Sequence, residues 1–492
     1  MGTLRHWLHI QPQSFLIGLA ELWGVEIPQA SHKRSVELLL DAASDDELLR
    51  DLIASCSPRA REALAFLLEG GGWATVDLFS FKYGERRPLG AGAMEREKPW
   101  RSPVNPTEEL WYKGLILESS RRIEGKIVPT FEIPEDFLPV LEAELPVPRF
   151  RLTATKCECV SSPYTLVSDF TVLLAYLYNR KGRMWAGRHP GKKDLAALAA
   201  RIGVEPEEGL SGKLGFLLAI ATEFGFVKVL DGKASIGRDE TVGWLDLPFV
   251  RAKKSLVKMW LGSRKWNDLC RLPEIRCGED LFNDVLGTRK RFLERLLMWT
   301  APGKTYRVEE MVSGFREWAM DFQRPSGDYN DWDVFGAVSG ERLSGRGRWE
   351  DVEGRLLESL LTRTMPWLGL AASCDGCFSW TAEGRRIVGA LLSGQETASA
   401  QEDHGPTLQL AGESSFVLAW HAAPRQVFRA CRVADWVGRK PDGVVFAFTR
   451  ASLKRALSRG ITLQQVLDFL EDAGGHDAAS RLEGALRRLL GR

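Results

Sequence analysis

The sequence repeats one arrangement three times, and this repeat constrains the fold more than any other feature. In each copy a helical stretch leads through a glycine into a short apolar run, a tight turn and a second apolar run. The three turns contain Glu124-Gly125, Asp231-Gly232 and Asp375-Gly376. Asp-Gly between apolar runs is a strong β-hairpin signal, because glycine accepts the positive φ that such a turn needs. We therefore predict a mainly α-helical chain with small β-hairpins, an α+β fold.

Helices are predicted before each hairpin, at residues 58–68 and 74–82, at 193–203 and at 289–299. A helix pair followed by a two-stranded hairpin is the winged-helix arrangement, in which the second helix can enter a major groove. We expect tandem winged-helix-like units over residues 1–150, 151–265 and 266–392. The alternative is that unrelated helix–hairpin segments share common turn chemistry.

Three stretches are predicted to lie outside regular structure, one of them at residues 180–190, between an apolar run and a helix that begins near Lys192. Residues 84–106 combine Pro, Gly and alternating charge, which a continuous helix or strand does not tolerate. Residues 393–406 are small and polar and are expected to form a flexible linker. Beyond it, residues 407–492 are predicted to form a small α/β unit. Its expected elements are extended residues 408–418, helix 424–437, strand 444–448 and helices 451–458, 463–472 and 477–490.

Length and composition exclude several classes of protein. The chain has 492 residues, of which 44% are hydrophobic and 27% charged, so it is long enough for several packed units and is not globally disordered. No uncharged apolar stretch reaches the ~18 residues that a membrane span needs. The eight cysteines are scattered, which does not form a disulfide framework and fits a reducing interior. We therefore expect a cytoplasmic protein.

The tail contains a family resemblance. Residues 446–448 form an aromatic strand, followed by Thr449, a helix that contains Ser452, then Gly460 and a leucine-containing helix at 463–472. This series resembles the signature of the XPB-type helicase N-terminal domain. Shorter stretches at 110–116, 349–354 and 367–370 are similar to bacterial helicase-associated proteins of that group. The resemblance implies a DNA-associated module, since in eukaryotic relatives the domain precedes a double-stranded-DNA translocase motor.

The sequence lacks the motifs of that motor. A phosphate-binding loop needs Gly-x-x-x-x-Gly-Lys-Ser/Thr, but Met298 stands where Gly303-Lys304-Thr305 requires the first glycine. Residues 209–213 have the wrong spacing, and no Asp-Glu-x-Asp or Asp-Glu-x-His box occurs. The metalloprotease, nucleophile-elbow and dinucleotide motifs are absent too. We expect a protein that is not an enzyme, with no catalytic residue and no cofactor.

Two basic sets are the candidate nucleic-acid contacts. The first is a predicted loop with a helix start, in which cations surround one tryptophan that could stack on a base; it comprises Arg180, Lys181, Arg183, Trp185, Arg188, Lys192 and Lys193. The second follows one face of the tail helix and comprises Arg450, Ser452, Lys454, Arg455 and Arg459, with the serine as a hydrogen-bond donor. Weaker copies occur at 288–291 and at Arg346 and Arg348. In each case the alternative is a solvated, solubilising surface.

Two further clusters of residues contain metal-ligating side chains, but each has a simpler interpretation. Cys374 and Cys377 have the CxxC spacing of zinc ligands, and Cys157 and Cys159 could supply others. A structural zinc site usually has both pairs in one small unit, so a plain hairpin turn with adjacent thiols is favoured and no metal is predicted. The acidic stretch 328–333 could hold Mg²⁺ in a nuclease, but it lacks a partner Lys or His and is interpreted as a loop.

The sequence thus predicts a non-catalytic accessory factor that binds the phosphate backbone of DNA in repair, transcription or related transactions. The expected partners are DNA and a separate helicase or nuclease subunit, with no membrane contact. The alternative is a protein-interaction scaffold that docks on a separately encoded helicase.

Overall fold

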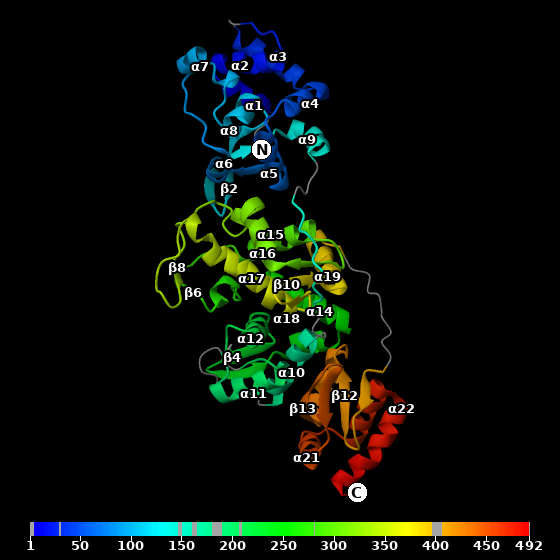
Figure 1. Cartoon of the computed structure of the whole chain (residues 1–492). Helices are drawn as coiled ribbons and strands as arrows, with labels where there is room; N and C mark the ends of the chain where they lie inside the picture. The colour runs from blue at the N-terminus through cyan, green and yellow to red at the C-terminus, as the bar shows by residue number, and fades with distance from the viewer. Residues whose placement is uncertain are drawn as a thin grey trace.

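The computed structural model describes residues 4–28, 31–145, 150–159, 165–179, 189–205, 209–279, 281–395 and 406–491. Within them the protein is mainly helical with small antiparallel sheets, which confirms the predicted α+β class. In Figure 1 the N-terminal helices lie at one end of an elongated molecule and the C-terminal unit lies at the other. The third unit lies between the first and the second, so the order in space differs from the order in sequence.

The first unit begins with four helices, α1 (Leu4–Ile10), α2 (Gln13–Trp23), α3 (His32–Ala42) and α4 (Asp46–Ala54). It continues with α5 (Pro58–Glu69), β1 (Trp73–Thr75), α6 (Val76–Tyr83), α7 (Ala91–Glu97), η1 (Pro99–Arg101), α8 (Pro106–Tyr112), β2 (Leu117–Ile123), β3 (Lys126–Glu132), η2 (Glu135–Phe137) and α9 (Leu138–Glu144). Helix α7 corrects the expectation that 84–106 contains no helix. It runs between Gly90 and Lys98 and ends before Pro99, so it fits between the breakers.

The second unit contains α10 (Thr165–Asn179), α11 (Lys192–Ile202), α12 (Lys213–Glu223), β4 (Val227–Leu230), β5 (Lys233–Ile236), α13 (Arg238–Leu245) and α14 (Phe249–Gly262). The predicted hairpin is confirmed. Asp231 has a φ of 49° and Gly232 a φ of 72°, the left-handed values of a two-residue turn.

The third unit contains most of the remaining elements of the main body. They are η4 (Leu269–Arg271), β6 (Ile275–Cys277), α15 (Val285–Trp299), β7 (Thr305–Arg307), α16 (Val308–Trp318), η5 (Met320–Phe322), β8 (Val334–Gly336), η6 (Arg346–Arg348), the π-helix η7 (Glu350–Gly354), α17 (Arg355–Ser359), the π-helix η8 (Leu360–Thr364), α18 (Met365–Trp367), β9 (Ala371–Cys374), β10 (Cys377–Trp380) and α19 (Ala382–Ser393). Thr381 caps α19 by accepting a hydrogen bond from the Gly384 amide at 3.0 Å.

The first and third units share an order of elements. In both, a helix leads into a short strand, several helical elements follow before a hairpin, and the short strand pairs with the second hairpin strand. The sheet orders are β1-β3-β2 and β7-β10-β9. Residues 150–159 then run along the third unit, where the Thr155 amide donates to the Thr305 carbonyl at 2.8 Å. This segment therefore packs on a unit far from it in sequence.

The C-terminal unit is a four-stranded antiparallel sheet with helices, in the strand order β11-β12-β14-β13. Its elements are β11 (Leu408–Leu410), β12 (Ser415–Ala419), α20 (Pro424–Val433), β13 (Asp435–Lys440), β14 (Gly443–Ala447), α21 (Arg450–Ser458) and α22 (Leu463–Leu490). The predicted helix 424–437 ends at Val433, because the chain turns there into β13 and pairs with β14. Gly475, with a φ of 79°, divides α22 at the predicted break between two helices.

Two hydrophobic cores lie on either side of α10. One runs continuously through the first three units, and the other fills the C-terminal unit and includes Val172 of α10. Tyr178 of α10 packs edge-on against Phe428 of α20, with ring centroids 5.6 Å apart. Helix α10 thus joins the C-terminal unit to the rest. Residues 396–405, most of the predicted linker, lie outside the described residues.

Two further features of the fold concern membrane-spanning helices and disulfides. No helix in the described part of the chain is long and apolar enough to cross a membrane. Cys270 and Cys277 form a disulfide, a pairing that the sequence did not predict.

Candidate nucleic-acid interface

The tail helix α21 begins with a capping box. The Thr449 hydroxyl accepts a hydrogen bond from the Ser452 amide, and the Ser452 hydroxyl accepts one from the Thr449 amide, both at 3.0 Å. Ser452 is completely buried. Its predicted role as a phosphate contact is therefore wrong, because its hydroxyl is enclosed at the helix start and bonded to the backbone.

The four cations of α21 and its C-cap divide into two that form no ion pair with the described residues and two that bond to other elements. Arg450 and Lys454, the first two, are exposed. Arg455 donates to the Asp435 carboxylate at 2.6 Å. Arg459 donates to both the side chain and the carbonyl of Asn179, the last residue of α10.

The contact between Arg459 and Asn179 joins the tail helix to the end of α10. Most of the first predicted basic set lies outside the described residues, namely Arg180, Lys181, Arg183, Trp185 and Arg188. The remaining two, Lys192 and Lys193, are exposed at the start of α11.

A cavity of about 240 Å³ lies at this junction, between α10, α11 and the C-terminal unit. Three guanidiniums line it, those of Arg201, Arg455 and Arg459, against the single carboxylate of Asp435. Burial alone would raise the pKa of Asp435, but hydrogen bonds from Thr449 and Arg455 lower it. Asp435 is therefore charged and neutralises one of the three cations. The cavity keeps a positive excess, which favours an anion such as phosphate.

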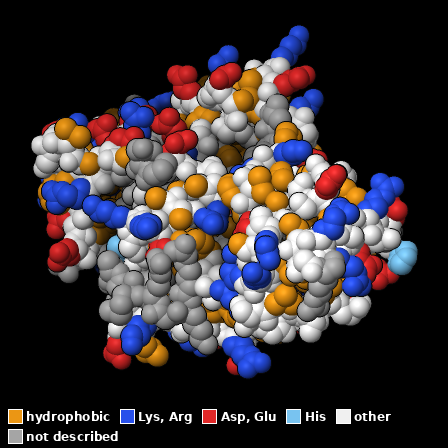
Figure 2. Space-filling view, turned by 90° about the horizontal axis from the view of Figure 1, so that it is seen from below, with side chains coloured by type: hydrophobic (Ala, Val, Ile, Leu, Met, Phe, Trp, Pro, Cys, Tyr) orange, Lys and Arg blue, Asp and Glu red, His pale blue; other side chains and the backbone are white. Residues whose placement is uncertain are grey.

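A buried ionic contact fixes the walls of this cavity. The Asp169 carboxylate of α10 accepts from Lys213 of α12 at 2.5 Å and from Arg439 of β13 at 2.7 Å. Asp169 is 1% exposed, so both cations reach it inside the junction. Figure 2 looks onto this end of the molecule, where Lys and Arg side chains are spread across the middle of the face.

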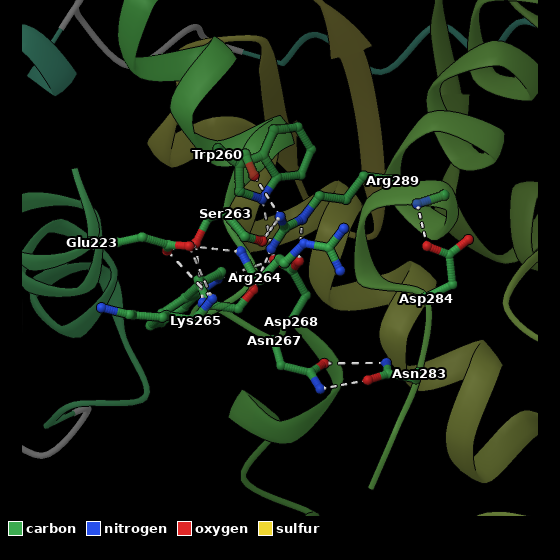
Figure 3. Close-up of polar contacts among 12 residues, drawn as sticks. Glu223, Trp260, Ser263, Arg264, Lys265, Asn267, Asp268, Asn283, Asp284 and Arg289 are labelled. Carbon is green, nitrogen blue, oxygen red and sulfur yellow. Dashed lines mark hydrogen bonds and ion pairs between the residues drawn. The ribbon is translucent and has the colours of Figure 1, made fainter. Parts of the chain in front are cut away.

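The weaker basic copies are not free surfaces. Arg289 is buried and donates to Asp268 at 2.7 Å and to the carbonyls of Trp260, Ser263 and Trp266, the arrangement drawn in Figure 3. Its prediction as a surface cation is wrong, because these carbonyls at the end of α14 need a buried donor. Arg346 pairs with Asp77, and Arg348 pairs with Glu341 and Asp351.

The acidic stretch 328–333 is occupied by cations and by a turn. Asp331 pairs with Lys126 at 2.6 Å and Asp333 with Arg342 at 3.0 Å, while Asp328 accepts from the Asn330 amide at 2.9 Å. These contacts favour the interpretation of the stretch as a structural loop over a magnesium site.

The cysteines are arranged differently from the sequence-based interpretation. The sulfur atoms of Cys157, Cys159 and Cys374 lie within 4.8 Å of one another, the one group with metal-ligating potential among the described residues. Neighbouring thiols, Cys159 first, raise the pKa of Cys374. Sequence spacing raised these cysteines as ligands but favoured a plain turn, because the two pairs are brought together only by the bridge between residues 150–159 and β7.

No protein-family model matches the chain, and no curated protein matches its sequence. Sequence reasoning also missed Arg201, Asp169 and Arg439, which face the junction from α11, α10 and β13. The local sequence carries no signal for them, since they meet only where the second unit packs against the C-terminal unit.

Proposed function

We propose that the protein is a cytoplasmic, non-catalytic DNA-binding accessory factor that contacts the phosphate backbone where α21 meets α10 and α11. The observation that carries this proposal is the hydrogen bonding of Arg459 to Asn179, which joins the tail helix to the end of α10 beside the cavity lined by Arg201, Arg455 and Arg459. Arg450 and Lys454 of α21 are exposed, and so are Lys192 and Lys193 at the start of α11. Such a surface gains affinity by releasing counterions from DNA.

The finer fold assignments belong to the same proposal. We infer that the first and third units are winged-helix units, since both have the strand order that places a first short strand against the second hairpin strand. We also infer that the C-terminal unit is an XPB-like N-terminal domain, because β14, the capped helix α21 and α22 follow the order of its signature.

One observation favours the scaffold as a second candidate function. The helices that precede the first two hairpins, α8 and α12, are mostly buried inside the protein. A buried helix cannot enter a major groove. These units therefore serve as supports, and a separately encoded helicase or nuclease is the partner that a scaffold of this kind would take.

The test is a fluorescence-anisotropy titration with single-stranded, duplex and forked DNA at two salt concentrations. Charge reversal in the double variant Arg450→Glu, Lys454→Glu is expected to weaken binding at least ~10-fold and to reduce the salt dependence by about one ion per lost phosphate contact. The matched control is Arg5→Glu, Lys33→Glu, which changes the same charge on exposed residues at the other end of the molecule.

Equal affinity of the two double variants would contradict the placement of DNA on α21. Negligible binding of the unmodified protein to every substrate, together with co-purification of an ATPase, would instead support the scaffold.

A further inference from the structure

Four cysteines from two distant stretches of sequence meet beside the hairpin of the third unit. Cys157 and Cys159 lie in the extended segment 150–159, which is bridged to β7 at Thr155 and Thr305. Cys374 ends β9 and Cys377 begins β10, so this pair flanks the hairpin turn. Strand β10 pairs with both β9 and β7, so the segment and the turn belong to one small sheet.

The sulfur separations fit a shared metal ion. The sulfurs of Cys157 and Cys374 are 3.3 Å apart, and those of Cys157, Cys159 and Cys374 all lie within 4.8 Å of one another. A disulfide requires about 2.05 Å, which is much shorter. Four sulfurs placed tetrahedrally about 2.3 Å from zinc are about 3.8 Å apart, which lies between the two observed limits.

Cys377 is positioned as the fourth ligand. Its side chain is buried, and it lies directly opposite Cys374 in the register of β9 and β10. The intervening Asp375 and Gly376 have φ values of 41° and 72°. This turn holds the two cysteines at the two-residue spacing that tetrahedral zinc sites use.

We propose that Cys157, Cys159, Cys374 and Cys377 bind one zinc ion in a structural site that fastens residues 150–159 to the hairpin of the third unit. Four thiolates leave no open coordination position, which is typical of structural and not catalytic zinc. Thiolate ligands select zinc over harder cations such as magnesium or calcium. Each thiol releases its proton as its sulfur binds, so up to four protons leave for each zinc ion bound.

A zinc ion at this location would fasten a segment that crosses from one unit to another. Residues 150–159 connect the first unit to α10 while crossing the third unit. The backbone hydrogen bond from Thr155 to Thr305 is 2.8 Å long, but the bond from Leu152 to Trp299 is stretched to 3.5 Å. A metal bound at Cys157 and Cys159 would hold the end of this crossing segment, beyond the reach of the sheet hydrogen bonds.

The test measures metal content of the full chain, purified under reducing conditions, by mass spectrometry of the elements. One zinc ion per chain is expected in the unmodified protein. In Cys157→Ser and in Cys374→Ser the content should fall below about a tenth of that, and Cys377→Ser should bind zinc at least ~10-fold more weakly in competition with a chelator. Cys431→Ser, at a free cysteine of the C-terminal unit, is the matched control and should keep the full content.

Cobalt substitution makes the outcome independent of variant folding. Cobalt in a four-thiolate site gives intense sulfur-to-metal charge-transfer absorption, so the unmodified protein alone decides the question. Absence of this absorption after addition of Co²⁺ under reducing conditions would overturn the proposal. A disulfide between Cys157 and Cys374 in the reduced preparation, or equal zinc loss in Cys431→Ser, would overturn it as well.

Discussion

Two carboxyls of the third unit, Asp321 and Glu353, are buried in its interior. Burial raises the pKa of Glu353 to about 7 and that of Asp321 to about 6. Glu353 accepts from Arg324 at 2.6 Å, and both side chains of this pair are at most 2% exposed. Burial costs the charged form more than Arg324 returns, so the folded state holds the proton of Glu353 more tightly than the unfolded chain.

This difference predicts a pH dependence of stability. Because the pKa of Glu353 rises from 4.5 to about 7 on folding, the free energy of unfolding should fall as pH rises through that interval. Glu353→Gln cannot ionise and should flatten this change by about 1–3 kcal/mol. Urea denaturation at several pH values measures it. Glu358→Gln, at an exposed carboxyl of α17, is the control, and an unchanged slope in Glu353→Gln would contradict the prediction.

At the same scale, the sequence located the cations but not their surroundings. The spacing of Arg450, Lys454, Arg455 and Arg459 was sufficient to place them near one helical face. It did not separate Arg450 and Lys454 from the two cations that bond to other elements, because Asp435 and Asn179 are distant in sequence. Arg289 shows the same limit, since its carbonyl partners come from α14 and the loop after it.

Helices and hairpins were predictable from the sequence where nearby turn or capping residues determine them. The three hairpins follow from turn residues that adopt positive φ, and Thr381 and Thr449 begin helices as helix caps should. Strand β13 was missed because residues 435–440 are a strand only through pairing with β14. The position of residues 150–159 likewise depends on their bridge to β7, which the local sequence does not signal.

The start of α21 permits a prediction about an element. The Thr449 hydroxyl accepts from the Ser452 amide and donates to Asp435 at 2.6 Å. Thr449→Ala removes both bonds and should lower the free energy of unfolding of the C-terminal unit by about 1–2 kcal/mol. Thr449→Ser keeps the hydroxyl and should recover most of the loss, while Ser458→Ala at the exposed end of α21 should have little effect. Equal losses in the alanine and serine variants of Thr449 would refute the capping role.

At the scale of the whole molecule, two cores meet at α10. The first three units share one continuous core, and the C-terminal unit has its own. Asp169 connects them by binding Lys213 on one side and Arg439 on the other. The docking of the C-terminal unit thus combines the apolar packing of Val172 and Tyr178 with one buried carboxylate that binds a cation on each side.

Asp169→Asn should therefore loosen the C-terminal unit while leaving the main body folded. The substitution leaves two cations without a buried counter-charge, a loss that typically costs about 3–5 kcal/mol. Hydrogen exchange is expected to accelerate in β13 and β14 but not in α15. Asp246→Asn provides the control, because Asp246 and Arg425 cross the same junction at 45% and 52% exposure and such pairs contribute about 0–1 kcal/mol. If α15 exchanged as much faster as β13, the two cores would unfold as one cooperative body, and the separation argued from the core packing would be wrong.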